Sequence, residues 1–262
     1  MKESKISAFV ITADQRPPYI LEACLQRARF ADELILVDKS QHGLKKDLIL
    51  AKKADRYVCA PWSPVVEDTR AFAQAQCTGD WIICLDDDEI LSPRAGDHVR
   101  SWLSSTDADV YYIPIKHYIL GSFVPQVGGG EIRPCLYRKG FVEYPSVVHV
   151  GAKIRDGARI RKMGDVWIEH LSHPDVAAWI EKTNRYTSVP NRSGQEIPQS
   201  LGRWAREIID RRLGSAGVYD YPQAVALLRA IYDIVDGLKR WEETQPNGEE
   251  AFRKICKEIV KE

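Results

Sequence analysis

The chain has 262 residues and no formal net charge, with 44% hydrophobic and 28% charged residues, which are ordinary values for a globular protein. No apolar run approaches eighteen residues, which excludes a hydrophobic membrane-spanning helix. The first residues lack the apolar region of a secretory signal, so we expect a cytoplasmic protein. Its six cysteines form no CxxC pair, and we expect reduced core residues.

Strands and helices alternate along the first ninety residues. The apolar segments 6–12, 33–38, 56–59 and 81–85 indicate buried strands. The segments 19–28, opened by two prolines, 44–54 and 67–76 have helical spacing. This alternation predicts a mostly parallel sheet with right-handed crossovers. The absence of G-x-G-x-x-G after the first strand, and of a P-loop motif anywhere, argues against dinucleotide and P-loop sites.

The strand that begins at Trp81 ends in four consecutive acids, residues 86–89. Acids at the carboxyl end of a parallel strand lie where open α/β sheets bind ligands. Their mutual repulsion is relieved when a divalent cation joins them and substrate phosphates complete its coordination. The alternative is a solvated acidic turn. Polar residues after the other strands favour a ligand and describe a nucleotide-diphosphate pocket. These candidates are Thr12, Ala13, Asp14, Asp38, Ser40, Arg70, Asp86 and Asp87.

The second half of the chain is more basic and then more helical. Eight basic residues lie between Arg133 and Lys162, which indicates either a surface for an anionic partner or a solvated face. Segments 174–187 and 199–213 are predicted helices. A third segment, 224–238, carries an apolar stripe at helical spacing, which we interpret as core or partner packing.

Three motifs together resemble the family 2 glycosyltransferases of GT-A fold. They are Ile-Thr-x-Asp at residues 11–14, Ala-Asp-Glu-Leu-Ile-Leu-Val-Asp-x-Ser at 31–40, and Gly-Asp-Trp-Ile-Ile-x-Leu-Asp-Asp-Asp-Glu at 79–89. With a later His170 and the segment 181–187, the chain is most similar to the lipopolysaccharide core β-glucosyltransferase branch. The resemblance implies an α/β, GT-A-like, mostly parallel sheet flanked by helices. It also implies a catalytic domain 1–173, with donor half 1–90 and acceptor half 91–173, followed by a helical extension 174–262.

The resemblance also implies roles for individual residues in donor binding. Thr12 and Asp38 would contact the nucleoside, and Asp86 the ribose or the metal. Asp88, within the DXD-type motif, would ligate Mn²⁺ or Mg²⁺ bridging the diphosphate. His170 would lie near the metal or the pyrophosphate, and a histidine ligand favours Mn²⁺. The alternative for His170 is a structural contact with the C-terminal helices.

The catalytic base is less well indicated, because Val150 stands where relatives often have a glutamate after Val-His. An inverting transfer needs a base within reach of the acceptor hydroxyl. The remaining candidates are Glu131, His149 and Asp87. We prefer Glu131, since the three glycines before it allow close approach of the backbone to a ligand, and place His149 next.

These features predict a metal-dependent, inverting glycosyltransferase that uses a nucleotide-sugar, preferentially a UDP-sugar. The acceptor is a hydroxyl, expected on a lipid-linked or lipopolysaccharide-type glycan at the inner membrane face. A hydroxylated base in DNA or a peptide side chain is an alternative acceptor. From another class of protein, a non-catalytic nucleotide-sugar-binding protein also fits, because the expected glutamate is missing.

Overall fold

The computed structural model describes residues 4–13, 17–40, 53–63, 66–125, 132–145, 151–188, 200–245 and 252–253. Contacts between residues divide the chain into two compact units, Met1–Asp175 and Val176–Glu262. The first unit contains all of the strands found in the described residues, and the second is helical. None of the helices in these ranges has the length and apolar character of a membrane span.

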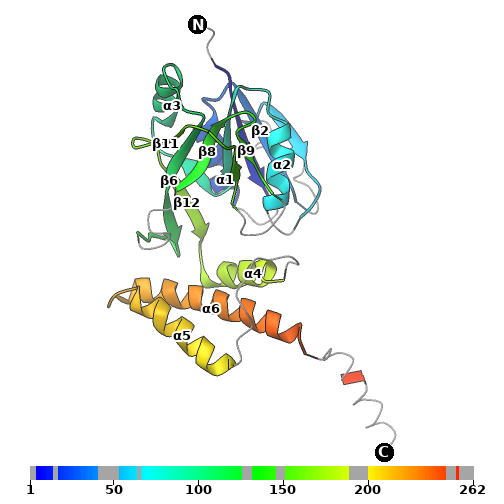
Figure 1. Ribbon diagram of the computed structural model, residues 1–262, viewed down its shortest axis with the longest axis vertical. Coiled ribbons are helices and arrows are strands. Elements are labelled where there is room, and N and C mark those ends of the chain that lie inside the picture. Colours follow the sequence, from blue (N-terminus) through cyan, green and yellow to red (C-terminus); the bar gives the residue numbers. More distant parts are fainter. Residues whose placement is uncertain are drawn as a thin grey trace, which may run out of the picture. The chain divides into compact units, whose positions relative to one another are not determined.

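One mixed sheet forms the centre of the first unit (Figure 1). Its order is β3-β2-β1-β4-β8-β6-β12-β5, with β7 and β11 also paired to β6. Strands β9 and β10 form a separate antiparallel pair. The strands are β1 (Ile6–Thr12), β2 (Glu33–Asp38), β3 (Arg56–Cys59), β4 (Trp81–Asp86), β5 (Glu89–Leu91), β6 (Val110–Ile119), β7 (Ser122–Phe123), β8 (Ile132–Arg138), β9 (Val142–Glu143), β10 (Lys153–Ile154), β11 (Ile160–Lys162) and β12 (Ile168–His173).

The amino-terminal half of the sheet is parallel throughout, from β3 to β4. Its first three strands have the bounds expected from sequence; β1 and most of β2 are apolar runs buried on both faces, whereas β3 is partly exposed. The carboxyl-terminal half is mixed: β8 is antiparallel to both β4 and β6, whereas β12 is parallel to β6. The predicted α/β class is therefore confirmed, with the parallel arrangement concentrated in the first half.

Helices cover both faces of this sheet (Figure 1). Helices α1 (Pro18–Ala28) and α3 (Ala95–Leu103) contribute to the core on one face, and α2 (Glu67–Ala75) contributes to the core on the other. Proline at the first position of α1 suits a helix start, because that residue needs no intrahelical N–H bond. The predicted helix 44–54 falls largely outside the described residues.

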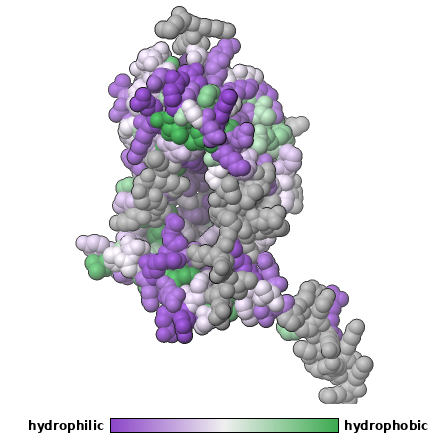
Figure 2. All heavy atoms as spheres, viewed as in Figure 1, coloured by the Kyte–Doolittle hydropathy of each residue, from purple (hydrophilic) through white to green (hydrophobic). Residues whose placement is uncertain are grey.

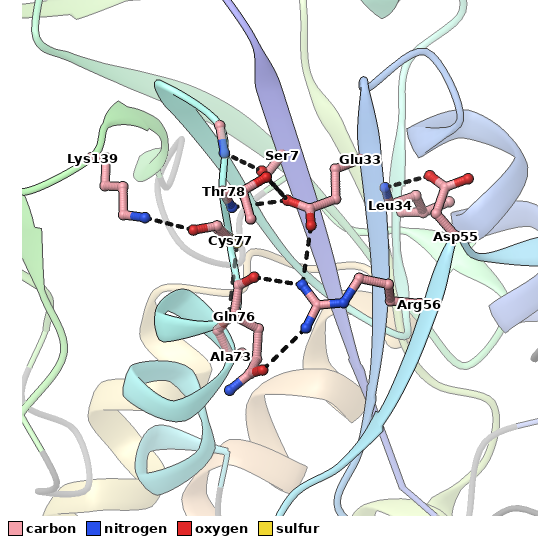
Figure 3. Close-up of polar contacts among 11 residues, drawn as sticks. Ser7, Glu33, Leu34, Asp55, Arg56, Ala73, Gln76, Cys77, Thr78 and Lys139 are labelled. Atoms are coloured by element: carbon pink, nitrogen blue, oxygen red, sulfur yellow. Dashed lines mark hydrogen bonds and ion pairs between the residues drawn. The ribbon is translucent and has the colours of Figure 1, made fainter.

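A polar network around Glu33 holds the amino-terminal ends of the central strands (Figure 3). Ser7 Oγ donates to Glu33 Oε2 over 2.6 Å, and both the backbone N and Oγ1 of Thr78 donate to the same oxygen at 2.9 Å. Arg56 Nη1 pairs with Glu33 Oε1 at 3.1 Å. Burial acts to raise the pKa of Glu33, but these donors outweigh it and lower the pKa. The network ties β1, β2 and β3 to the turn before β4.

Four of the cysteines are buried in the first unit, as expected of reduced core residues: Cys24, Cys77, Cys84 and Cys135. The expectation is wrong for Cys59, which is exposed at the end of β3. The reason is that β3 is the outermost strand of the parallel half, so its residues are less covered than those of β1. Cys256 lies outside the described residues.

The second unit contains α4 (Val176–Tyr186), α5 (Leu201–Gly214) and α6 (Asp220–Glu242), which confirms the helical extension. The stripe predicted on 224–238 is buried only in part: Leu228 is 6% exposed, but Leu227 and Leu238 are each 41% exposed. Small residues instead form much of the buried face of α6, including Ala226, Ala230 and Gly237. On the face of the molecule in view, Figure 2 shows small apolar areas among hydrophilic side chains.

We expect Gly237→Ala to destabilise the second unit, although alanine is intrinsically favoured over glycine in a helix by about 1 kcal/mol. A Cβ at this buried position would lie 2.0 Å from Cη2 of Trp204 on α5, so the indole ring must shift. Overpacking of this kind costs about 1–3 kcal/mol, which outweighs the propensity gain. Thermal unfolding of the variant and the parent measures the sign. A raised melting temperature would contradict the packing described here.

Candidate functional site

The carboxyl ends of three parallel strands bring the sequence-predicted residues to one edge of the sheet. Thr12 at the end of β1 is in register with Asp38 at the end of β2, and Ile11 is in register with Asp86 on β4. Ala13 and Ser40 follow directly. Asp14, Glu131 and His149 lie outside the described residues, so their assignments stay predictions.

Asp87 braces the end of β1. Its Oδ2 accepts hydrogen bonds from Thr12 Oγ1 at 2.9 Å and from the backbone N of Ala13 at 3.3 Å. Asp87 is buried, and so is Thr12. The hydroxyl proton of Thr12 is therefore engaged in a hydrogen bond to Asp87. This pair fixes the carboxyl end of β1, beside which a ligand would lie.

Asp38 is held in a similar way at the end of β2. Its Oδ1 accepts from the backbone N of Ser40 at 2.8 Å, an Asx-type turn, and its Oδ2 accepts from the hydroxyl of Tyr57 on β3. Burial, followed by this carboxylate, raises the pKa of Tyr57, so the tyrosine remains a donor. The aspartate is thus oriented by neighbours from two directions.

Asp86 is surrounded by cationic side chains. Arg70 Nη2, from α2, donates to Asp86 Oδ2 over 2.7 Å, and Arg133 Nη1, from β8, lies 3.5 Å from the same oxygen. Burial acts to raise the pKa of Asp86, but Arg70 and then Arg133 outweigh it and hold the pKa below its ordinary value. The second oxygen, Oδ1, is buried without a hydrogen-bond partner in the described part of the chain, which leaves an acceptor for a ligand hydroxyl.

Glu89 is buried and contacts both Asp86 and Arg133. Its Oε2 accepts from the backbone N of Asp86 at 2.9 Å and from Arg133 Nη2. Burial raises the pKa of Glu89, and Arg133 opposes the rise. Arg133 was counted in the predicted basic surface, but its guanidinium faces these two acids. The sequence predicts a divalent cation that neutralises the acids at 86–89. Arg133 supplies part of that positive charge, to Asp86 and Glu89.

Asp88 points elsewhere, toward β12. Its Oδ2 lies 3.4 Å from His170 Nε2, and its side chain is 4% exposed. The backbone N of Leu171 donates to the carbonyl of Asp88 at 2.9 Å, which fixes the turn against β12. On the other side of the ring, His170 Nδ1 lies 3.0 Å from Nδ1 of His117 on β6. Asp86 and Glu89 thus share Arg133, whereas Asp87 contacts the end of β1 and Asp88 contacts β12.

The spacing of Asp88 and His170 fits a shared divalent cation. Two ligand atoms each about 2.1 Å from one ion, at angles near 90–105°, lie roughly 3.0–3.4 Å apart. Within the described residues, no group of three or more His, Cys, Asp or Glu side chains is arranged to hold an ion. The pair therefore fits a cation whose remaining ligands are phosphate oxygens and waters, the coordination that Mg²⁺ commonly has.

Several of the basic residues expected to face an anionic partner are paired within the first unit. Arg138 and Arg159 lie 3.5 and 3.1 Å from the carboxylate of Asp109, and Arg161 lies 3.4 Å from that of Asp107. With Arg133 paired to Glu89 as well, half of the eight basic residues from Arg133 to Lys162 neutralise acids of the same unit. This segment therefore offers less uncompensated charge than its composition indicates.

Comparison with known proteins gives four relatives that bear on the family. An uncharacterised glycosyltransferase of Rickettsia conorii is 32% identical over 247 residues, which cover 89% of this chain and 83% of that protein. One of Rickettsia typhi is 30% identical, with 89% and 80% covered. One of Rickettsia prowazekii is 23% identical, also with 89% and 80% covered. A fourth, from Rickettsia bellii, is 35% identical over 107 residues, about a third of that protein.

Two solved structures are also similar to this chain. A crystal structure of S. aureus TarS 1-349 has 13% identity and a TM-score of 0.48, with 92% of each chain covered. The mannosyltransferase PcManGT of Pyrobaculum calidifontis, in complex with GDP-Man and Mn²⁺, has 11% identity and a TM-score of 0.42, with 99% and 81% covered. No family model matches the sequence.

The extent and identity of the match to the Rickettsia conorii protein define the class of this chain, which is a glycosyltransferase. It belongs to the family of these uncharacterised rickettsial glycosyltransferases.

Proposed function

We propose that this glycosyltransferase transfers a hexose or related sugar from a nucleotide-sugar to a hydroxyl acceptor, with inversion and with the help of a divalent cation. The observation that carries the proposal is the Asp88–His170 pair at 3.4 Å, next to Asp86 with its unpartnered Oδ1 at the same sheet edge. A carboxylate–imidazole pair can hold a divalent cation that binds phosphate oxygens, and the nearby carboxylate oxygen of Asp86 can accept a hydrogen bond from a ribose hydroxyl. This combination suits a nucleoside diphosphate better than it suits a neutral metabolite.

The residues at this edge of the sheet would have different roles in donor binding. Asp86 would accept a ribose hydroxyl through Oδ1, while Asp87 and Asp38 keep the ends of β1 and β2 in place. Asp88 and His170 would hold Mn²⁺ or Mg²⁺, and such an ion stabilises the negative charge of a departing nucleoside diphosphate. Arg70 and Arg133 both approach Oδ2 of Asp86, so neither pairs with Oδ1.

For the acceptor proton we propose Glu131 as the base, with His149 as the alternative. If Glu131 removes the proton, Glu131→Gln is expected to lower turnover by a factor on the order of 10² or more. Donor affinity should be nearly unchanged, since the base acts on the acceptor. Parallel measurement of transfer and of UDP affinity in Glu131→Gln and His149→Ala decides between them. If only the histidine substitution abolishes transfer, His149 is the base.

For the acceptor we propose a lipid-linked or lipopolysaccharide-type glycan, modified at the inner face of the membrane, as in the glucosyltransferase branch that the motifs resemble. A phosphate-bearing acceptor would meet Lys153 and Lys162, exposed basic residues of the segment that follows the donor half. Binding to anionic vesicles and to single- and double-stranded DNA, each measured over a range of salt, separates the glycolipid from the DNA alternative.

The proposed function is tested by incubating the full chain with UDP-glucose, UDP-galactose or GDP-mannose in the presence of Mn²⁺. Slow release of nucleoside diphosphate from one donor, dependent on the metal, is the expected result. Calorimetric binding of a donor without any release would instead favour a non-catalytic nucleotide-sugar-binding protein. In the same assay Asp97→Asn, which changes an exposed aspartate on α3, should release nucleoside diphosphate at the rate of the parent.

A further inference from the structure

His117 is a buried histidine whose side chain faces the proposed cation ligand His170. The two residues are in register on the parallel strands β6 and β12, so their side chains leave the sheet on the same face. Their rings meet edge to face, with centroids 5.0 Å apart and an interplanar angle of 67°. The two Nδ1 atoms are 3.0 Å apart, and the backbone of His117 is fixed by the N–H of Val124 donating to its carbonyl at 2.9 Å.

A contact of 3.0 Å between two ring nitrogens requires one proton between them, because two lone pairs or two N–H groups would repel. That proton allows two arrangements. When His117 is the donor, His170 carries its own proton on Nε2 and can donate it to Asp88. When His170 is the donor, its Nε2 is an unprotonated lone pair facing a carboxylate.

Only the second arrangement suits a cation between Asp88 and His170, since a metal binds the lone pair of a neutral imidazole. Without a cation the first arrangement is favoured, because Nε2–H then meets the carboxylate oxygen 3.4 Å away. The partner of Nδ1 must therefore donate in one state and accept in the other. A lysine or arginine can only donate and a carboxylate can only accept, whereas histidine does both.

We propose that His117 is a positioning residue, which presents His170 to a divalent cation by accepting a hydrogen bond from Nδ1–H of His170 when the cation binds. In this change the shared proton passes from Nδ1 of His117 to Nδ1 of His170, the Nε2 proton of His170 is released to solvent, and Nε2 of His117 takes up a proton from solvent. The inference rests on the metal-dependent function proposed above. His117 does not touch the cation. Its contribution is to fix the ring of His170 and to satisfy Nδ1 in both tautomers. Such outer partners of metal-binding histidines are worth about 10–100-fold in metal affinity.

The test compares His117→Phe, which keeps a ring of similar shape, with His117→Asn, which restores a donor and an acceptor at the δ position. Mn²⁺ affinity of the full chain, saturated with UDP, is followed by the loss of the free-ion electron paramagnetic resonance signal. We expect His117→Phe to weaken Mn²⁺ binding by about 10-fold or more, and His117→Asn to recover most of the affinity. UDP affinity in EDTA should be the same in all variants. His98→Phe on α3 is the matched control.

The inference is overturned if His117→Phe binds Mn²⁺ as tightly as the parent while His170→Ala binds it weakly. If His170→Ala also binds as tightly as the parent, or if the parent shows no UDP-dependent Mn²⁺ binding, the metal site itself is wrong and the role of His117 is excluded with it. Should His117→Phe fail to fold, His117→Gln replaces it. Its amide lies one bond beyond the δ position, so weaker binding than in His117→Asn is expected, and equal binding overturns the proposal.

Discussion

Substitution of Asp88 by asparagine is expected to remove metal-dependent donor binding and to lower turnover by a factor on the order of 10² or more. The change deletes the charge that would hold the cation with His170 but preserves the shape of the side chain. Its backbone carbonyl still accepts from Leu171, so the turn should keep its conformation. UDP affinity by calorimetry, with Mn²⁺ and with EDTA, measures the effect directly.

The fold of this variant is checked by circular dichroism, and Asp97→Asn again serves as the control for a lost exposed carboxylate. A variant at residue 88 that retains the full gain in UDP affinity on adding Mn²⁺ would show that Asp88 is not a metal ligand. The pair with His170 would then be an ordinary carboxylate–imidazole contact.

Arg133→Met is expected to destabilise the first unit by about 3 kcal/mol. Arg133 is the ion-pair partner of the buried Glu89 and also lies 3.5 Å from Asp86, so its removal leaves buried negative charge uncompensated. Burial already raises the pKa of Glu89, and without Arg133 the acid must either become neutral or remain charged at high cost. The free energy of unfolding in urea measures the loss.

Two further variants identify the cause of the stability loss in Arg133→Met. Arg133→Met combined with Glu89→Gln removes both charges of the pair, so it should recover part of the stability lost in the single variant. Arg161→Met breaks the exposed pair with Asp107 and should leave the unfolding free energy nearly unchanged. If the double variant is less stable than Arg133→Met alone, lost packing rather than unpaired charge is responsible.

Three strands of the parallel half, β1, β2 and β4, could be predicted from sequence because each is a short apolar run that is largely buried on both faces. The position of Thr12, Asp38 and Asp86 at one edge follows from the same pattern, since each residue ends a parallel strand. The start of α1 was likewise indicated by its prolines.

Arg70 and His170 were expected near the acids, but other partners could not be predicted, because they depend on contacts between distant segments. Arg133 is 44 residues from Glu89 in sequence and was interpreted as part of a basic surface, since composition does not reveal which arginines face inward. His117 was missed altogether: it lies in an alternating strand with no motif around it, and only the register of β6 against β12 places it beside His170. The only available signal was a histidine on the buried face of that alternation.

The thiol of Cys59 lies at the carboxyl end of the outermost parallel strand, in register with Asp38. The other cysteines in the described part of the chain are buried, and burial raises the pKa of the thiols of Cys24, Cys77, Cys84 and Cys135. A maleimide fluorophore should therefore react first at residue 59 among these positions, because thiolate is the reactive form. The dye would then report, in real time, on occupancy of the neighbouring strand edge while the interior stays unmodified.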